Sequence, residues 1–250
     1  MLFPVRLAAI TALALSIPAA AAAVAKPSPA DRELVVMVDT ANDMPMSRFE
    51  QYRLVDGIQK DLGDALGRIL ERKVRFLALP RKRIAMALEK GDADVLCGYK
   101  PDWLPGNFAW SQPFLTQVEV VLTDRGAVRP PAVGALASQP IGTVFGYKYP
   151  KLEEELGDAF IRADGPSVDL NLAKLAAGRL HHMSAVQSWF DYRLRQGSVK
   201  VPLHPPLVIA VHHTRCALSM RSPLKLRDLD HALDKISTDG TLSAIEARYK

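Results

Sequence analysis

The chain has 250 residues, with 32 Lys or Arg against 27 Asp or Glu, and its formal net charge is +5 at pH 7. Basic and acidic residues are interspersed without a long basic tract. This argues against nucleic-acid binding, because that function needs a clustered basic face. The length is enough for one large domain or two small lobes. The mild positive charge is compatible with a preference for anionic small molecules.

The N-terminus has the pattern of a secretory signal. Arg6 is the only charged residue before Lys26, and the apolar run at 7–18 is too short to span a bilayer. Alanines follow it and provide small-residue cleavage sites after Ala23 or Ala25. No later segment is apolar enough to cross a membrane. We therefore expect residues 1–25 to be a cleaved signal peptide and the mature protein to be periplasmic.

The first half of the mature chain alternates strand and helix patterns. The expected elements are a strand at 34–38, a helix at 58–69, a strand at 74–79, a short helix at 83–90 and a strand at 93–97. A single apolar stripe predicts the first helix. Gly91 is suited to end the second helix. Strands that alternate with helices predict an α/β protein whose mostly parallel sheet is covered by helices on both faces.

A second alternating series follows a Pro- and Gly-rich connection at 126–140. The expected elements are strands at 118–123 and 141–144, helices at 150–156 and 168–177, a strand at 180–184, a helix at 185–196 and strands at 208–211 and 216–220. Ser167 is a suitable cap for the helix that begins at 168. The chain then ends in helices that carry apolar residues from Leu229 to Tyr249. Periodicity alone predicts a two-part α/β protein.

Several segments in this order carry a resemblance to a known family. They are GIQKDLGDALGRILERKVRF, PRKRIAMALEKGDADVLCGY, FAWSQPF, LNLAKLAAGRL and DLDHALDKISTDGTLSAIEARYK, and they extend over nearly all of the mature chain. The chain resembles the family 3 extracellular solute-binding proteins, periplasmic receptors that deliver small polar solutes to ABC importers. The resemblance implies a two-lobe, type II periplasmic-binding-protein fold. Residues 26–115 and 206–250 would form the first lobe and residues 116–205 the second, and the lobes would close over a ligand.

Ligands in open α/β sheets bind beyond the carboxyl ends of the strands. Together with the resemblance, this rule predicts the following ligand-binding residues: Asp39, Asn42, Arg81, Arg83, Tyr99, Lys100, Trp103, Tyr147, Lys148, Tyr149 and Gln187. Relatives carry an Arg at the offset of Arg83, so we expect Arg83 and the helix start after Tyr149 to form an anion site. Alternatively, residues 81–83 are a solvated helix start and the tyrosines only cover a lobe surface.

The departures from the family pattern concern its ligand anchors. Amino-acid-binding relatives usually carry an Arg about six residues before the FS element, but the segment DWLPGN contains no basic residue. Their usual ammonium-binding Asp is replaced by Val186, and Asp43 and Met44 precede Pro45 where an aromatic residue is usual. Burying an ammonium without its carboxylate costs several kcal/mol. We therefore expect an anionic or uncharged solute in place of an α-amino acid.

Other functions have weaker support. Ser111 lacks the context of a catalytic serine, and the adjacent residues of each pair, His181–His182 and His212–His213, point to opposite faces of a strand. We therefore expect no catalytic residue, no metal and no cofactor. A periplasmic sensor or accessory protein of the same fold is the alternative, followed by a dehydratase-like enzyme. The expected partners are a small molecule and an ABC permease, without nucleic acid or membrane insertion, and we expect a monomer.

Cys97 and Cys216 are the only cysteines. An exported pair can form a disulfide, and in the resembling family the strands that would carry them could be neighbours. The other possibility is that both are buried apolar fillers, because free Cys is among the most buried residue types. The sequence leaves both open.

Overall fold

The structure is a computed structural model that describes residues 33–249. The predicted signal peptide, residues 1–25, lies outside the described residues. None of the helices between residues 33 and 249 combines the length and the apolar character that a membrane crossing requires.

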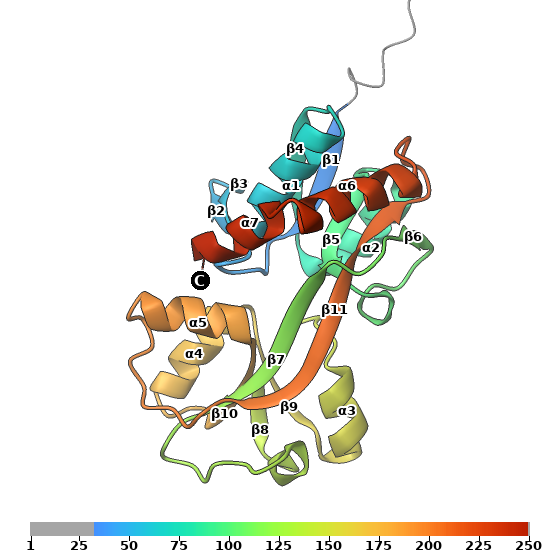
Figure 1. Cartoon of the computed structure of the whole chain (residues 1–250). Helices are drawn as coiled ribbons and strands as arrows, with labels where there is room; N and C mark the ends of the chain where they lie inside the picture. The colour runs from blue at the N-terminus through green and yellow to red at the C-terminus, as the bar shows by residue number, and fades with distance from the viewer. Residues whose placement is uncertain (1–32, 250) are drawn as a thin grey trace, which may run out of the picture.

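The first lobe is built on a parallel sheet with two antiparallel additions. Strands β1 (Leu34–Asp39), β4 (Val74–Leu79) and β5 (Val95–Tyr99) are parallel in the order β4-β1-β5. The long strand β11 (Leu207–Ser219) adds antiparallel to β5, and the short β6 (Phe108–Trp110) pairs with β11. This lobe lies at the top of Figure 1.

Helices cover both faces of this sheet. Helices α1 (Ile58–Ile69), α6 (Leu226–Thr238) and α7 (Thr241–Tyr249) pack on one face, where Leu66 and Leu233 belong to the same core cluster. Helix α2 (Arg81–Lys90) packs on the other face through Ile84 and Leu88. The α/β fold class predicted from the alternating patterns is therefore confirmed.

The second lobe repeats this design with different helices. Strands β8 (Pro140–Val144), β9 (Ile161–Gly165) and β10 (His182–Val186) are parallel in the order β10-β8-β9. Helices α4 (Val168–Ala176) and α5 (Gln187–Arg195) share one core cluster, and α3 (Pro150–Leu156) lies in the cluster on the other face. Ser167 caps α4 as predicted, because its hydroxyl accepts a hydrogen bond from the amide of Leu170.

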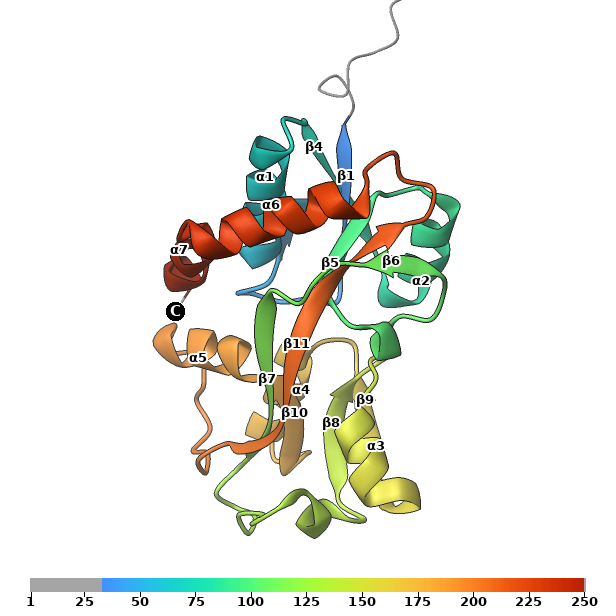
Figure 2. The same cartoon turned by 45° about the vertical axis from the view of Figure 1, so that its right-hand side comes forward.

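Two long strands join the lobes. Strand β7 (Leu115–Thr123) pairs with β11 over residues 207–214, and β11 then continues beyond a bulge at Arg215 and Cys216 to pair with β5 and β6. Figure 2 shows β7 and β11 side by side between the lobes. The sequence predicted two separate strands at 208–211 and 216–220, but they form one strand of 13 residues. We call these paired strands the hinge strands.

Four short strands were not predicted from the sequence patterns. A hairpin of β2 (Arg48–Glu50) and β3 (Arg53–Asp56) follows a cis peptide bond between Met44 and Pro45. Strand β9 was missed because it is an edge strand with the sequence IRADG, in which Ile161 is 42% exposed. Strand β6 has only three residues. Short 3-10 turns lie at Pro101–Trp103, Val133–Leu136 and Gly157–Ala159.

The two cysteines form a disulfide between β5 and β11. Cys97 and Cys216 are directly opposite each other in the antiparallel pair, and their Cα atoms are 3.9 Å apart. Both side chains are buried in the core that α1, α6 and α7 cover. The disulfide hypothesis is therefore confirmed, and the bond ties the last strand to the first half of the chain.

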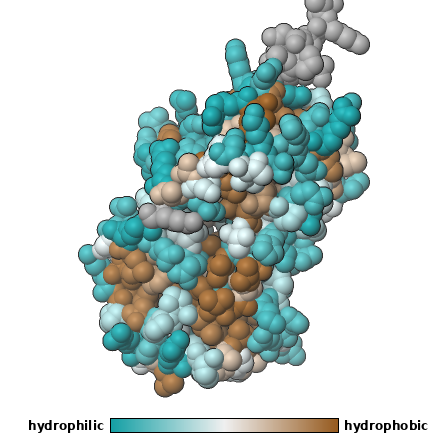
Figure 3. Space-filling model, viewed as in Figure 1, coloured by the Kyte–Doolittle hydropathy of each residue, from teal (hydrophilic) through white to brown (hydrophobic). Residues whose placement is uncertain are grey.

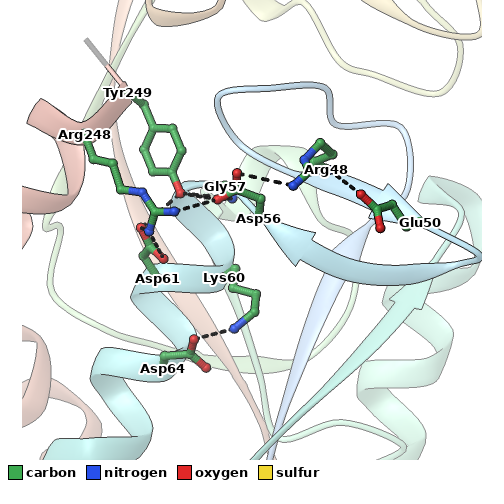
Figure 4. A network of polar contacts seen from close by, with 9 residues as sticks. All are labelled: Arg48, Glu50, Asp56, Gly57, Lys60, Asp61, Asp64, Arg248 and Tyr249. Atoms are coloured by element: carbon green, nitrogen blue, oxygen red, sulfur yellow. Dashed lines mark hydrogen bonds and ion pairs between the residues drawn. The ribbon is translucent and has the colours of Figure 1, made fainter.

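The C-terminal helix is fastened to the first lobe by a polar network. In Figure 4 the Tyr249 phenol lies between the carboxylates of Asp56 and Asp61, 2.8 and 3.0 Å away, and it accepts a hydrogen bond from the amide of Gly57 at 3.1 Å. Arg248 pairs with both carboxylates. Helix α7 is therefore anchored to the start of α1.

The visible surface differs between the lobes. Figure 3 shows a mostly hydrophilic first lobe and an apolar area on the second lobe. The large exposed apolar side chains of β11 are those of Val208 and Val211, which are 57% and 54% exposed. They lie on the outer side of the hinge strands, outside the cavity described below.

Candidate functional site

A cavity of about 110 Å³ lies between the two lobes. It is smaller than the roughly 300–1,000 Å³ of pockets that hold drug-sized ligands, so it suits a compact solute. Residues of both lobes and of the hinge strands line it: Asn42, Met46, Gln59, Arg81, Gly98, Tyr99, Trp103, Gln117, Glu119, Val144, Tyr147, Lys148, Tyr149, Val168, Ser184, Ala185, Val186 and His212.

Arg81 is the central cation of the first-lobe wall, and it is already paired. Its Nη1 lies 3.6 Å from Oδ2 of Asp39, a fully buried carboxylate at the end of β1. The Tyr99 hydroxyl donates to the same oxygen at 2.9 Å. Burial raises the pKa of Asp39 above its ordinary value. The backbone amide of Ala41, the guanidinium of Arg81 and the hydroxyl of Tyr99 act in the opposite direction. Burial also raises the pKa of Tyr99 well above its ordinary value, so the phenol remains a donor.

The guanidinium of Arg81 is also held between two aromatic rings from different lobes. It lies 4.4 Å from the ring centre of Tyr99 and 4.7 Å from that of Tyr147. The Tyr147 hydroxyl in turn donates to Oδ1 of Asn42 at 2.9 Å. Cation–π contacts of this kind stabilise a desolvated cation. Arg81 and Tyr147 therefore form one bridge between the lobes.

Three further contacts cross the opening between the lobes. The amide of Asp169, in the first turn of α4, donates to Oδ2 of Asp43 at 3.5 Å. The Lys82 ammonium lies 4.1 Å from the ring centre of Phe145. Arg195 on α5 donates to the carbonyl oxygen of Tyr249 on α7. Together with the Tyr147 bridge, these contacts join the two lobes.

A buried polar group forms the hinge side of the cavity. Glu119 on β7 is 7% exposed; its Oε1 accepts from the Ser184 hydroxyl at 3.0 Å, and its Oε2 lies 3.0 Å from Nε2 of His212. The His212 ring meets the Trp103 ring edge-on with centres 4.8 Å apart. Glu119 and Gln117 are two residues apart on β7, so both side chains point to the same face of that strand.

Two polar atoms at the cavity have no hydrogen-bond partner. One is Oε1 of Gln59, which lies in the first turn of α1 and is 6% exposed. The other is Nε1 of Trp103. An unpaired buried polar atom costs about 1–3 kcal/mol. Gln59 and Trp103 both line the cavity, while these two atoms themselves are buried.

Seven residues nominated from the sequence line this one cavity: Asn42, Arg81, Tyr99, Trp103, Tyr147, Lys148 and Tyr149. Asp39 lies behind the wall and contacts Arg81 and Tyr99. Lys100 and Gln187 do not reach the cavity lining. Lys100 pairs with Asp102 at 3.3 Å, and Gln187 donates to Asp191 one helical turn further along α5 at 2.6 Å.

The expected anion site at Arg83 is not assembled. Arg83 is exposed on α2 and points away from the cavity lining, since Arg81, two residues earlier, is the residue that turns inward. At the other half of the expected site, the amide of Tyr149 at the start of α3 already has an acceptor in Oε1 of Glu153, 3.4 Å away. The Tyr149 hydroxyl is buried, where it accepts from the amide of Val144.

Five polar residues of the cavity lining were not predicted from the sequence: Gln59, Gln117, Glu119, Ser184 and His212. A signal existed for two of them, because Gln117 and Glu119 place polar groups at alternate positions of an otherwise apolar strand. Gln59 lies at the start of an amphipathic helix, where a polar residue is unremarkable. Among residues 33–249 no three His, Cys, Asp or Glu side chains are grouped as a metal site would require.

No protein-family model and no curated protein matches the sequence. Solved structures do match it. An ancestral arginine-binding protein bound to arginine has a TM-score of 0.73 at 17% identity, covering 87% of this chain and 97% of that one. The chain has the type II periplasmic-binding-protein fold.

Two further structures with this fold illustrate the range of similar proteins. The ancestral amino-acid-binding protein AncCDT-1, a precursor of cyclohexadienyl dehydratase, has a TM-score of 0.71 at 18% identity, covering 87% of this chain and 95% of that one. The arginine-, lysine-, histidine-binding protein ArtJ from Geobacillus stearothermophilus has a TM-score of 0.70 at 16% identity, with coverages of 87% and 95%. The resemblance to solute-binding proteins is thus confirmed at the level of the fold, at identities that mark a divergent chain.

Proposed function

We propose that this protein binds a small polar solute in the cavity between its lobes, as the binding component of an ABC importer. The observation that carries the proposal is the cavity itself, which residues of both lobes and of the strands between them line. The similar proteins named above bind amino acids. A periplasmic location follows from the signal-like N-terminus and agrees with the disulfide.

The solute differs from an ordinary α-amino acid in this proposal. The cavity lining contains Val186 where an ammonium-binding Asp is usual, and its buried cation Arg81 is paired with Asp39. The sequence favoured an anionic or uncharged solute. The support for an anion rested on Arg83 and the start of α3, and these groups are exposed or already partnered.

A thermal-shift screen with a blocked cavity tests the proposal. The mature protein would be screened against amines, amides, organic acids, amino acids and sugars, since a solute that binds only the native state raises the melting temperature. Val186→Trp fills the cavity and is expected to abolish the shift, whereas Val208→Trp, at an exposed position of β11, should leave it unchanged. A shift that survives Val186→Trp would place binding elsewhere and contradict the proposal.

Solute binding should strengthen as the pH falls from 7 to 5. In the closed lobes, burial raises the pKa of Asp43 from 3.8 to about 6, and the nearby Asp169 carboxylate adds to the rise. The backbone amide of Asp169, the charge of Arg193 and the side chain of Ser167 oppose it. When the lobes open, Asp43 enters water and its pKa returns toward the ordinary value. Closure therefore takes up a proton between these two values, and lower pH favours the closed form.

Asp43→Asn is the matched variant for this pH dependence. Asparagine keeps an acceptor for the Asp169 amide and removes the charge. We expect it to bind more tightly than the native protein at pH 7 and to lose most of the change between pH 7 and pH 5, measured by calorimetric titration. An unchanged pH profile in Asp43→Asn would assign the dependence to another group.

A further inference from the structure

The cavity has two buried carboxylates nearby, those of Asp39 and Glu119, and only Asp39 pairs with an arginine. The side chain of that arginine, Arg81, is 11% exposed. Arg81 lies next to Asp39. Lys148, the other cation of the lining, is exposed. His212 contacts one oxygen of Glu119 and neutralises the carboxylate only when the ring is protonated. The hinge side of the cavity therefore carries a buried carboxylate.

Glu119 has room for a further donor. A carboxylate has about four lone-pair sites, and the Ser184 hydroxyl and His212 use one site on each oxygen. Gln59 lines the same cavity, and its buried amide oxygen has no hydrogen-bond partner. Two acceptors, one of them charged, call for a solute that donates several hydrogen bonds.

The remaining walls suit the carbon skeleton of a cation. Trp103, Tyr99 and Tyr149 contribute aromatic surface, and Val144 and Val186 contribute aliphatic surface. Each of these three rings already lies near a cation of the protein, which is Lys100 for Trp103, Arg81 for Tyr99 and Arg162 for Tyr149. The rings therefore supply apolar surface, and the charge preference depends on Glu119. A carboxylate brought into this space would be repelled by Glu119, whereas an ammonium group would be attracted.

We infer that Glu119 is the acidic anchor of the cavity and that the solute is a compact organic amine, which donates from its ammonium group to Glu119 and Gln59. This inference rests on the proposed function and narrows it. It replaces the sequence-based expectation of an anionic or uncharged solute. The acidic anchor lies on hinge strand β7, away from position 186, where the sequence shows a valine.

Three probes of equal size test the inference. They are n-butylammonium, propionamide and propionate, which have the same number of non-hydrogen atoms and differ in charge. We expect n-butylammonium to bind the mature protein in calorimetric titration, propionamide to bind at least tenfold more weakly, and propionate to show no binding.

The variants locate the binding group. Glu119→Gln keeps the shape of the side chain, replaces one acceptor oxygen with a donor nitrogen and removes the charge. We expect n-butylammonium to lose at least tenfold in affinity and the preference over propionamide to disappear. Glu154→Gln, an exposed carboxylate on α3, is the control and should behave as the native protein. Gln59→Met removes the unpartnered oxygen. It should weaken n-butylammonium binding while raising the melting temperature of the ligand-free protein, which a purely structural residue would not do.

The outcomes separate this inference from the proposed function. Binding of propionate or propionamide in preference to n-butylammonium would overturn the amine inference and leave solute binding intact. Equal loss of n-butylammonium binding in Glu119→Gln and Glu154→Gln would overturn the role of Glu119. Absence of n-butylammonium binding would overturn the inference, and absence of any shift in the wider screen would overturn the proposed function as well.

Discussion

Replacing both cysteines, Cys97→Ala together with Cys216→Ala, is expected to lower the free energy of unfolding by about 4–5 kcal/mol. The disulfide joins residues separated by 119 positions, and closing so long a loop removes much entropy from the unfolded chain. Both side chains are buried, so the substitution also leaves a small cavity in the core of the first lobe. Urea denaturation of the native protein and of the double variant measures the difference.

Reduction provides the internal control for this prediction. A reducing agent should destabilise the native protein by a similar amount and leave the double variant unaffected. Two free thiols in the unfolded, unreduced native protein would show that the disulfide is not present and would contradict the expected loss.

Arg81→Met is expected to destabilise the protein by about 3 kcal/mol or more. Methionine fills the space between the rings of Tyr99 and Tyr147 but leaves the fully buried carboxylate of Asp39 without its cation. Removing one partner of a buried pair typically costs about 3–5 kcal/mol. Burial already raises the pKa of Asp39, and loss of Arg81 removes a group that opposes the rise. The destabilisation should therefore shrink as the pH falls and Asp39 takes up a proton.

Two variants make the Arg81 experiment specific. Asp39→Asn combined with Arg81→Met removes the uncompensated charge and should recover part of the lost stability at pH 7. Arg83→Met lies two residues further along the same helix with its side chain exposed, so it should change the free energy of unfolding by less than about 0.5 kcal/mol. Equal destabilisation by Arg81→Met and Arg83→Met would contradict the buried-pair account.

Most of the fold was predictable because its elements have strong periodic patterns. The helix at Ile58–Ile69 and the strand at Val74–Leu79 have the predicted bounds, since one shows a single apolar stripe and the other a compact apolar run bounded by Pro80. The weak elements had no such signal. Strand β9 is a polar edge, and β11 was divided in two because its middle, His212–His213–Thr214–Arg215, reads as polar although it crosses between the lobes.

The cavity was predictable where it follows from strand ends and unpredictable where it depends on side-chain direction. The strand-end rule found Asn42, Tyr99 and Tyr147 because the carboxyl ends of parallel strands meet at one edge. It could not separate Arg81 from Arg83, which lie on the same helix but face different surroundings. It also missed Glu119 and His212, because these residues lie within the hinge strands and not at their ends.

The distance between the lobes tests the account most directly. Spin labels at Arg83→Cys and Glu154→Cys would occupy exposed positions on α2 and α3, one in each lobe, and the two native cysteines are already joined to each other. Adding the solute that gives the largest thermal shift should shorten the interlabel distance and narrow its distribution, and in a Val186→Trp background it should have no effect. An unchanged distance distribution in the native background at a saturating solute concentration would contradict binding between closing lobes.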